Sequence, residues 1–203
     1  MAKTVFDKIL DTTTGPKSYD WYRKEVKKMT TPGARSLINQ GKATLRPKYG
    51  VMNLFAYDPK HKATLPYYDR FPLIMPLQAA KGGFYGLNFH YLPFGQRVRF
   101  LRQLSKYASD KNFDRNTRYN LTGGIENNRY FKLTVKHYLW NHIRTMFLNI
   151  TADEMPIAIF LPIARFVGAS QEAIGFKQTL GNSIINNLEI NISGSESNVN
   201  TYG

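Results

Sequence analysis

The sequence predicts an α+β protein with a small antiparallel β-barrel core, SH3-like or open, flanked by helices, an extended basic N-terminal arm and a polar C-terminal tail. Short β-favouring runs with tight links fill residues 49–91, and apolar stripes at helical spacing flank them. The first part of the chain is rich in Lys and Arg, and the last part in Asn and Ser. We therefore divide the chain into an arm (residues 1–48), a globular α+β domain (49–181) and a tail (182–203).

Composition limits the classes of protein that the chain can represent. Of its 203 residues, 42 % are hydrophobic, which is enough to bury a core, and the net charge is +14. The absence of cysteine excludes disulfides, thiolate metal sites and thiol nucleophiles. No apolar run approaches the roughly 18 residues of a membrane span, and the first residues lack the apolar segment of a secretory signal. We expect a soluble basic protein with no membrane partner.

The positive charge is concentrated in one half of the chain. Residues 1–110 hold 19 basic and 7 acidic side chains, whereas residues 111–203 hold 9 and 7. Such clustering predicts a polyanion or an acidic protein surface as a neighbour. The alternative is that the excess of lysine only keeps the protein soluble.

The arm contains one predicted helix, from about Ser18 to Met29. Tyr22, Val26 and Met29 fall on one face at helical spacing, and Pro32-Gly33 ends the segment. So short a helix needs a surface to lie on, which its own core or a partner could provide. Its other faces carry four cations: Arg23, Lys24, Lys27 and Lys28.

Three strands are predicted in the next segment, at Val51–Tyr57, Phe71–Leu77 and Phe84–Tyr91. Pro72 and Pro76 cannot donate ladder hydrogen bonds, so the second strand should lie at a sheet edge or be bent. The third strand alternates between two sets of side chains. We expect the more aromatic set (Tyr85, Leu87, Phe89 and Tyr91) to face the core and the other set (Phe84, Gly86, Asn88 and His90) to face away.

The rest of the globular domain mixes predicted helices with apolar strands. Apolar stripes predict helices at Phe94–Tyr107 and Phe131–Met146. Thr151 and Glu154 have capping-box spacing, although Pro156 should keep that helix short. The last elements are one or two buried strands within Ile157–Val167 and a helix from Ser170 to about Thr179.

The search for catalytic or metal-binding patterns finds none. The four histidines (His61, His90, His137 and His142) lack the spacing of a helical zinc site. The run Gly82–Gly86 precedes a strand and fits a tight hairpin better than a phosphate loop. We therefore expect no enzyme, no cofactor and no metal; a metal-dependent nuclease would need acids brought together from distant segments.

Features suited to binding are better represented. The candidate polyanion-binding or partner-binding cations are those of the first helix together with Arg97, Arg99, Arg102 and Lys106. Tyr67, Tyr68 and Tyr91 could stack on unpaired bases or pack the barrel, and packing is the preferred interpretation. Because no known base-reading motif is present, contact with nucleic acid should involve the backbone and not the sequence.

Two aromatic segments, Leu65–Leu73 and Gly83–Pro93, are distinctive. With Tyr57–Lys60 and Lys136–Leu139, they resemble a family of small virion structural proteins from large contractile-tailed bacteriophages, some of which are labelled DNA end protectors. The resemblance covers about Tyr49 to Val167 and leaves the arm and tail outside.

The resemblance implies a non-enzymatic virion subunit of the tail, baseplate or neck, joined to several other virion proteins through its core and extended termini. The alternative is a virion protein that binds and protects genomic DNA ends through its basic surface. The family segments should serve as scaffold, with Asp69 paired to Arg70, and Asn88 and His90 satisfying backbone groups. The scaffold residues are Tyr67, Tyr68, Asp69, Arg70, Phe71, Gly86, Asn88 and His90.

Overall fold

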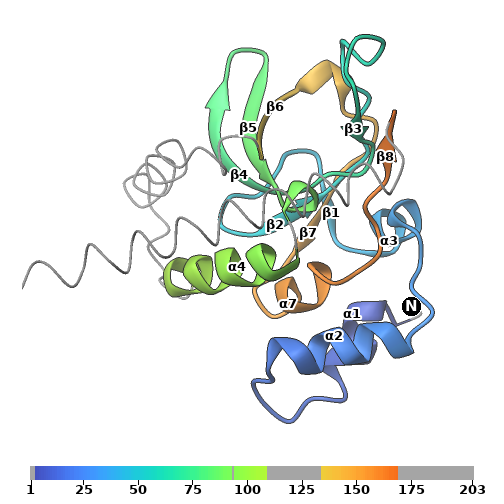
Figure 1. The fold of residues 1–203 in the computed structure, drawn as a ribbon, viewed down its shortest axis with the longest axis vertical. Coiled ribbons are helices and arrows are strands. Elements are labelled where there is room, and N and C mark those ends of the chain that lie inside the picture. The colour runs from blue at the N-terminus through green and yellow to red at the C-terminus, as the bar shows by residue number, and fades with distance from the viewer. Residues whose placement is uncertain (1–2, 93, 109–133, 169–203) are drawn as a thin grey trace, which may run out of the picture.

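A computed structural model describes residues 3–92, 94–108 and 134–168 of the chain. The predicted helix from Ser170 and the tail of residues 182–203 lie outside the described residues. The described residues form an α+β fold, as predicted, and their main sheet is antiparallel (Figure 1). This sheet has six strands in the order β1-β7-β2-β4-β5-β6 and is not closed into a barrel.

The helices and strands have the following bounds. The helices are α1 (Val5–Leu10), α2 (Tyr19–Lys28), α3 (Ala34–Gln40), α4 (Phe94–Ala108) and α7 (Met155–Ala158), with short 3-10 turns η1 (Phe89–Tyr91) and η2 (Trp140–His142). The strands of the main sheet are β1 (Ala43–Thr44), β2 (Met52–Leu54), β4 (Leu73–Ala80), β5 (Gly83–Asn88), β6 (Val135–Leu139) and β7 (Phe147–Ile150). Strands β3 (Tyr68–Asp69) and β8 (Phe166–Val167) form a separate antiparallel ribbon.

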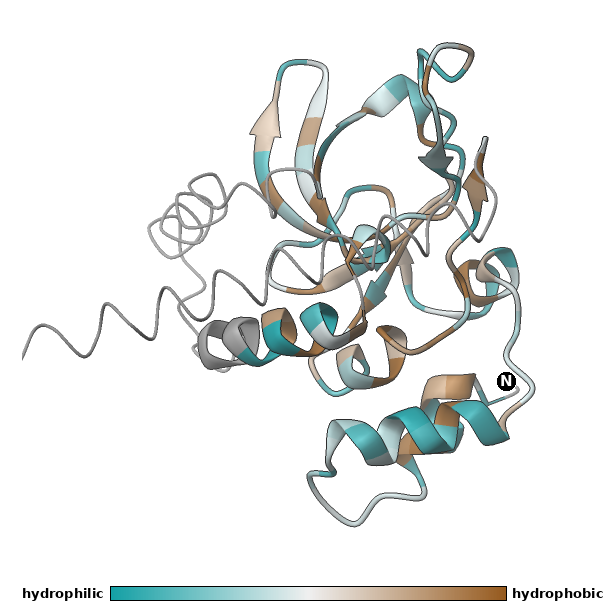
Figure 2. Ribbon diagram, viewed as in Figure 1, coloured by the Kyte–Doolittle hydropathy of each residue, from teal (hydrophilic) through white to brown (hydrophobic). Residues whose placement is uncertain are grey.

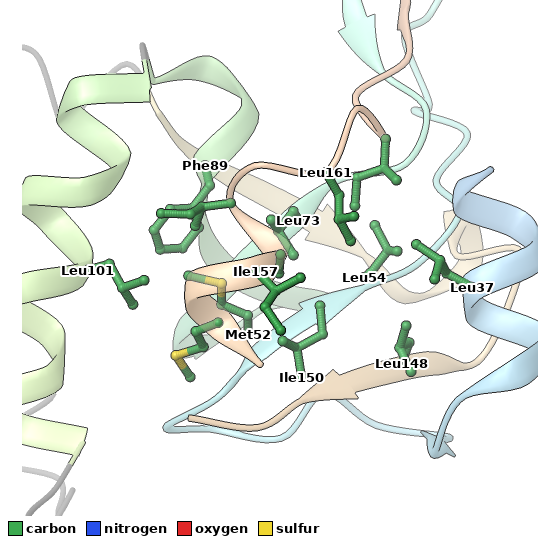
Figure 3. Close-up of a cluster of buried hydrophobic side chains, with 14 of the residues drawn as sticks. Leu37, Met52, Leu54, Leu73, Phe89, Leu101, Leu148, Ile150, Ile157 and Leu161 are labelled. Atoms are coloured by element: carbon green, nitrogen blue, oxygen red, sulfur yellow. The ribbon is translucent and has the colours of Figure 1, made fainter. Parts of the chain in front are cut away.

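Helices cover one face of the main sheet. Leu54, Leu73 and Ile150 project from its central strands into a large apolar core with Ile157 of α7 (Figure 3). Helices α1 and α2 lie beyond α7, on the side away from the sheet (Figure 1). Burial of these side chains is the main stabilising contribution of this layer.

A second, smaller core lies on the other face of the sheet and is mostly aromatic. Phe55 is at its centre: its ring centroid is 4.7 Å from that of Phe147 and 5.3 Å from that of Tyr138. The Tyr138 contact is edge-to-face, a favourable geometry for aromatic pairs. The cluster consists of Phe55, Tyr57, Ile74, Phe84, Tyr138 and Phe147.

The N-terminal segment is helical and packs on the body of the protein, so the prediction of an extended arm with one helix is wrong. The predicted helix exists as α2, with Ser18 as its N-cap and with Tyr22 and Val26 buried. Two more helices, α1 and α3, bury Ile9 and Leu37 in the same core. Each has seven residues or fewer, too short for a convincing helical stripe.

The strand predictions hold in position but not in every detail. Strand β4 is central, so Pro72 and Pro76 do not mark an edge; instead, the β4–β5 register shifts between Pro76 and Gln78. Strand β5 contributes to both cores, because Phe84 enters the aromatic cluster and Leu87 the large core. The prediction that Phe84 faces away from the core and Tyr85 faces into it is therefore wrong: Tyr85 is exposed.

Two predictions for the C-terminal half are wrong. Residues 131–146 do not form the predicted α-helix where described, because β6 pairs with β5 and places Tyr138 in the aromatic cluster. The segment Ile157–Val167 does not form long buried strands: it continues α7 and ends in β8. The predicted short helix is confirmed as α7, preceded by a hydrogen bond from the Thr151 backbone N–H to the Glu154 carboxylate at 2.7 Å.

Gly83 allows β5 and β6 to approach closely because it has no side chain. A Cβ atom at Gly83 would lie 2.0 Å from the carbonyl oxygen of Tyr138, so Gly83→Ala should separate the strands and destabilise the fold by about 1–3 kcal/mol. Gly95 of α4 is the matched control: its Cβ would meet no atom within 4 Å. Gly95→Ala should be neutral or stabilising by up to about 1 kcal/mol. Urea unfolding of both variants checks the prediction, and equal midpoints would contradict it.

Candidate nucleic-acid interface

The outer face of α2 is a strip of positive charge. Arg23 and Lys27 form one row at i, i+4 spacing, and Lys24 and Lys28 form the next; all four side chains are exposed. The opposite face holds the buried Tyr22, and most of the helix is coloured as hydrophilic in Figure 2. Like charges at i, i+4 disfavour the isolated helix, so an anion lying along both rows would relieve the repulsion.

Few acids offset these four cations. Glu25 forms an ion pair with Lys28. Asp20 is in the first turn, where a negative charge favours the helix dipole. Among the described residues, no ion pair joins Arg23, Lys24 or Lys27 to a carboxylate. The strip therefore keeps most of its charge for an external partner.

Helix α4 adds cations beside α2. Arg99 and Arg102 are exposed on α4, and the guanidinium carbon of Arg102 lies 5.3 Å from the ring centroid of Tyr19, at the start of α2. Burial raises the pKa of the Tyr19 phenol, so this ring stays neutral beneath the cation at neutral pH. Lys17, which precedes α2, places its Nζ atom 6.0 Å from the ring centroid of Trp21 in α2. The structure thus brings Arg102 together with the α2 strip; the side chain of Lys106 lies outside the described residues.

Arg97 does not belong to this surface, so its prediction as a polyanion contact is wrong. Its side chain is buried, and burial lowers its pKa to about 10. The guanidinium donates to three backbone carbonyls: to Leu92 at 2.8 Å, and to Ile159 and His90 at 3.2 Å each. Arg97 therefore ties α4 to η1 and to the end of α7.

The scaffold residues meet in a buried polar cluster. The Asp69 carboxylate accepts from His90 Nδ1 at 2.7 Å and from Asn88 Nδ2 at 3.1 Å. The Asn88 side-chain oxygen accepts from the His90 backbone N–H at 2.9 Å, in keeping with the role expected of Asn88, whereas the His90 ring bonds to a carboxylate and not to a backbone group. His90 Nε2 is buried without a hydrogen-bond partner.

The expected Asp69–Arg70 pair is wrong. Asp69 is buried and engaged with His90, whereas Arg70 is exposed, with its guanidinium carbon 6.0 Å from the Phe71 ring centroid. Successive strand residues point to opposite faces, which separates these two side chains.

The tyrosines considered for base stacking are engaged within the protein. The rings of Tyr67 and Tyr91 stack on each other at 6.0 Å, and the Phe166 ring contacts both edge-on. Tyr68 is half-buried in β3. Gly86 is also structural, because a Cβ there would lie 2.8 Å from Ile74 Cδ1. Packing, the preferred interpretation of these rings, therefore fits the structure.

Two further cations lie outside α2 and α4: Arg46, one of the basic residues of the predicted arm, and Arg165, which was not predicted. The guanidinium carbon of Arg46 lies 4.4 Å from the Trp140 ring centroid, and Arg165 lies opposite Arg70 beside the β3–β8 ribbon. The neighbours of Arg165 in space come from distant segments of the chain. The scarcity of acidic residues near Arg165 in the sequence was therefore the one feature that could have marked it as a binding residue.

The described residues were searched for metal-ligand clusters and for membrane-spanning helices. Within residues 3–92, 94–108 and 134–168, no group of three or more His, Asp or Glu side chains could hold a metal ion. Nor does any helix in these ranges have the length and apolarity needed to cross a membrane.

Comparison with known proteins identifies a family. The chain matches the model of the phage T4 terminal DNA protecting protein over residues 3–179. Searches of curated proteins and of solved structures found no match. The match includes the N-terminal helices, so the expectation that they lie outside the family is wrong, while the resemblance to a phage family with DNA end protectors is confirmed. This chain therefore belongs to the family of the phage T4 terminal DNA protecting protein.

Proposed function

We propose that this protein binds the ends of linear double-stranded phage DNA in the virion, holding backbone phosphates with the cations of α2 and α4. The observation that carries the proposal is the double row of exposed cations on α2, with Arg102 of α4 against Tyr19 at its start. The matched family supports DNA ends as the ligand. Lysine and arginine contacts of this kind bind phosphates without reading bases.

The size of the surface suits a short stretch of DNA. Helix α2 has 10 residues and is therefore about 15 Å long. A single strip of this length contacts a few phosphates on one strand, which is compatible with a protein seated at a terminus. We propose that protection comes from occupying the end, without catalysis and without a cofactor.

The competing function is that of a structural subunit in the tail, baseplate or neck. This function was supported mainly by the expectation of an extended N-terminal arm that wraps around neighbouring subunits. Helices α1, α2 and α3 instead bury Ile9, Val26 and Leu37 in the protein's own core. The outer face of α2 is then presented on a folded body, an arrangement that suits a nucleic acid contact.

A comparison of open and closed DNA tests the proposed function. The full-length protein is titrated, at roughly physiological salt, into a blunt duplex and into a duplex of the same sequence closed at both ends by hairpin loops. Fluorescence anisotropy should show tighter binding to the open duplex, and both affinities should fall steeply with salt. Equal affinities would overturn the preference for ends, and no binding to either DNA would favour protein partners.

A further inference from the structure

Arg70 and Arg165 lie directly opposite each other at the end of the β3–β8 ribbon. The ribbon pairs Tyr68 with Val167 and Asp69 with Phe166 in antiparallel register. Arg70 directly follows β3 and Arg165 directly precedes β8, and the backbone N–H of Arg70 donates to the Arg165 carbonyl at 2.8 Å. Residues opposite each other in this way have Cβ atoms about 5 Å apart.

Both arginine side chains lie on the outer face of the ribbon. Asp69 is buried, whereas Arg70, directly after β3, and Arg165, directly before β8, are both exposed. Like charges directly opposite each other destabilise a strand pair. In the described part of the chain, no carboxylate forms an ion pair with either guanidinium. The ribbon therefore carries an uncompensated double positive charge.

The backbone that carries the two arginines is held firmly. Asp69 Oδ1 accepts from the backbone N–H of Phe71 at 3.1 Å and from that of Arg165 at 3.4 Å. The other oxygen of the same carboxylate bonds to His90 and Asn88. One buried carboxylate thus fixes both strands, so little conformational freedom of the backbone is lost when a ligand binds between the arginines.

We propose that Arg70 and Arg165 form a fork that binds one phosphate group of the DNA end. This inference rests on the proposed function and adds a contact separate from α2, since the ribbon lies well away from α2 and α4 (Figure 1). Guanidinium groups bind phosphate through paired hydrogen bonds, and two of them match the charge of a terminal phosphate monoester. An internal phosphodiester offers the same oxygens with less charge.

The test uses the full-length Arg70→Gln/Arg165→Gln variant and two blunt duplexes, one with 5′-phosphate ends and one with 5′-hydroxyl ends. Its matched control is Lys60→Gln/Lys81→Gln, which removes two exposed positive charges elsewhere. The arginine variant should bind the 5′-phosphate duplex at least about tenfold more weakly than the control does. Its urea midpoint should be unchanged or higher, because a like-charge pair is removed.

The two duplexes distinguish the source of the phosphate. If the arginine variant loses affinity only for the 5′-phosphate duplex, the fork binds the terminal phosphate monoester. If it loses affinity equally for both duplexes, the fork binds an internal phosphodiester. If the wild type prefers open ends and the arginine variant binds like its control, the fork is overturned while the proposed function stands. If the wild type binds neither duplex, both proposals fail.

Discussion

Asp69→Ala is expected to destabilise the fold by about 3–5 kcal/mol, the cost of removing one partner from a buried charged network. The carboxylate accepts hydrogen bonds from His90, Asn88 and Phe71, all at 3.1 Å or less. Alanine would leave the buried side chains of His90 and Asn88 without this hydrogen-bond partner. It would also remove the link that joins the β3–β8 ribbon to β5 and η1. Urea denaturation followed by circular dichroism measures the loss.

Asp58→Ala provides the matched control for this prediction. Asp58 has two ion-pair partners, Lys62 at 2.9 Å and Arg144 at 3.5 Å, but it lies at the surface. A hydrogen bond from Lys62, with a smaller effect from Arg144, holds the pKa of Asp58 below its ordinary value, yet exposed pairs of this kind contribute little to stability. If Asp58→Ala and Asp69→Ala cost the same, the Asp69 cluster is not the structural centre proposed here.

Replacing all four α2 cations with glutamine should weaken binding to open duplex ends by about two orders of magnitude at physiological salt. Each lost phosphate contact should also reduce the slope of log affinity against log salt concentration by about 0.9. Glutamine is a good helix former, so α2 should remain folded. The variant carries Arg23→Gln, Lys24→Gln, Lys27→Gln and Lys28→Gln, and anisotropy titrations over a range of salt measure both quantities.

A control with the same change in charge separates location from net charge. It replaces one exposed arginine and three exposed lysines outside α2: Arg35, Lys42, Lys60 and Lys81. This variant should lose far less affinity, because these residues lie on other elements. An equal loss in both variants would mean that DNA responds only to overall charge, and the assignment of the interface to α2 would then be wrong.

The sequence predicted those elements whose periodicity is local. Helices α2 and α4 have clear apolar stripes, and β5 follows a recognisable Gly-Gly turn. The prediction of a helix at residues 131–146 was wrong because the spacing of their apolar residues fits a helix as well as a strand. Pairing with β5 and insertion of Tyr138 into the aromatic cluster decide the outcome, and both are tertiary interactions.

The site was predictable only in part, for a similar reason. The α2 cations were found because they lie close together in the sequence. Arg97 and Arg99 are both cations of one predicted helix, but Arg97 is buried and donates to the carbonyl of Ile159, a residue far along the chain. The pairing of Arg70 with Arg165 depends on the β3–β8 register, which joins two distant segments. Contacts of this range leave no local pattern to detect.

Protection of linear DNA from an exonuclease tests the central claim most directly. A blunt linear duplex is saturated with the full-length protein at physiological salt, and a processive exonuclease that starts at ends is then added. The account predicts that the wild type delays digestion strongly, while the α2 variant with four glutamines leaves digestion close to its rate on bare DNA. Digestion at the bare-DNA rate in the presence of saturating wild-type protein would contradict the account.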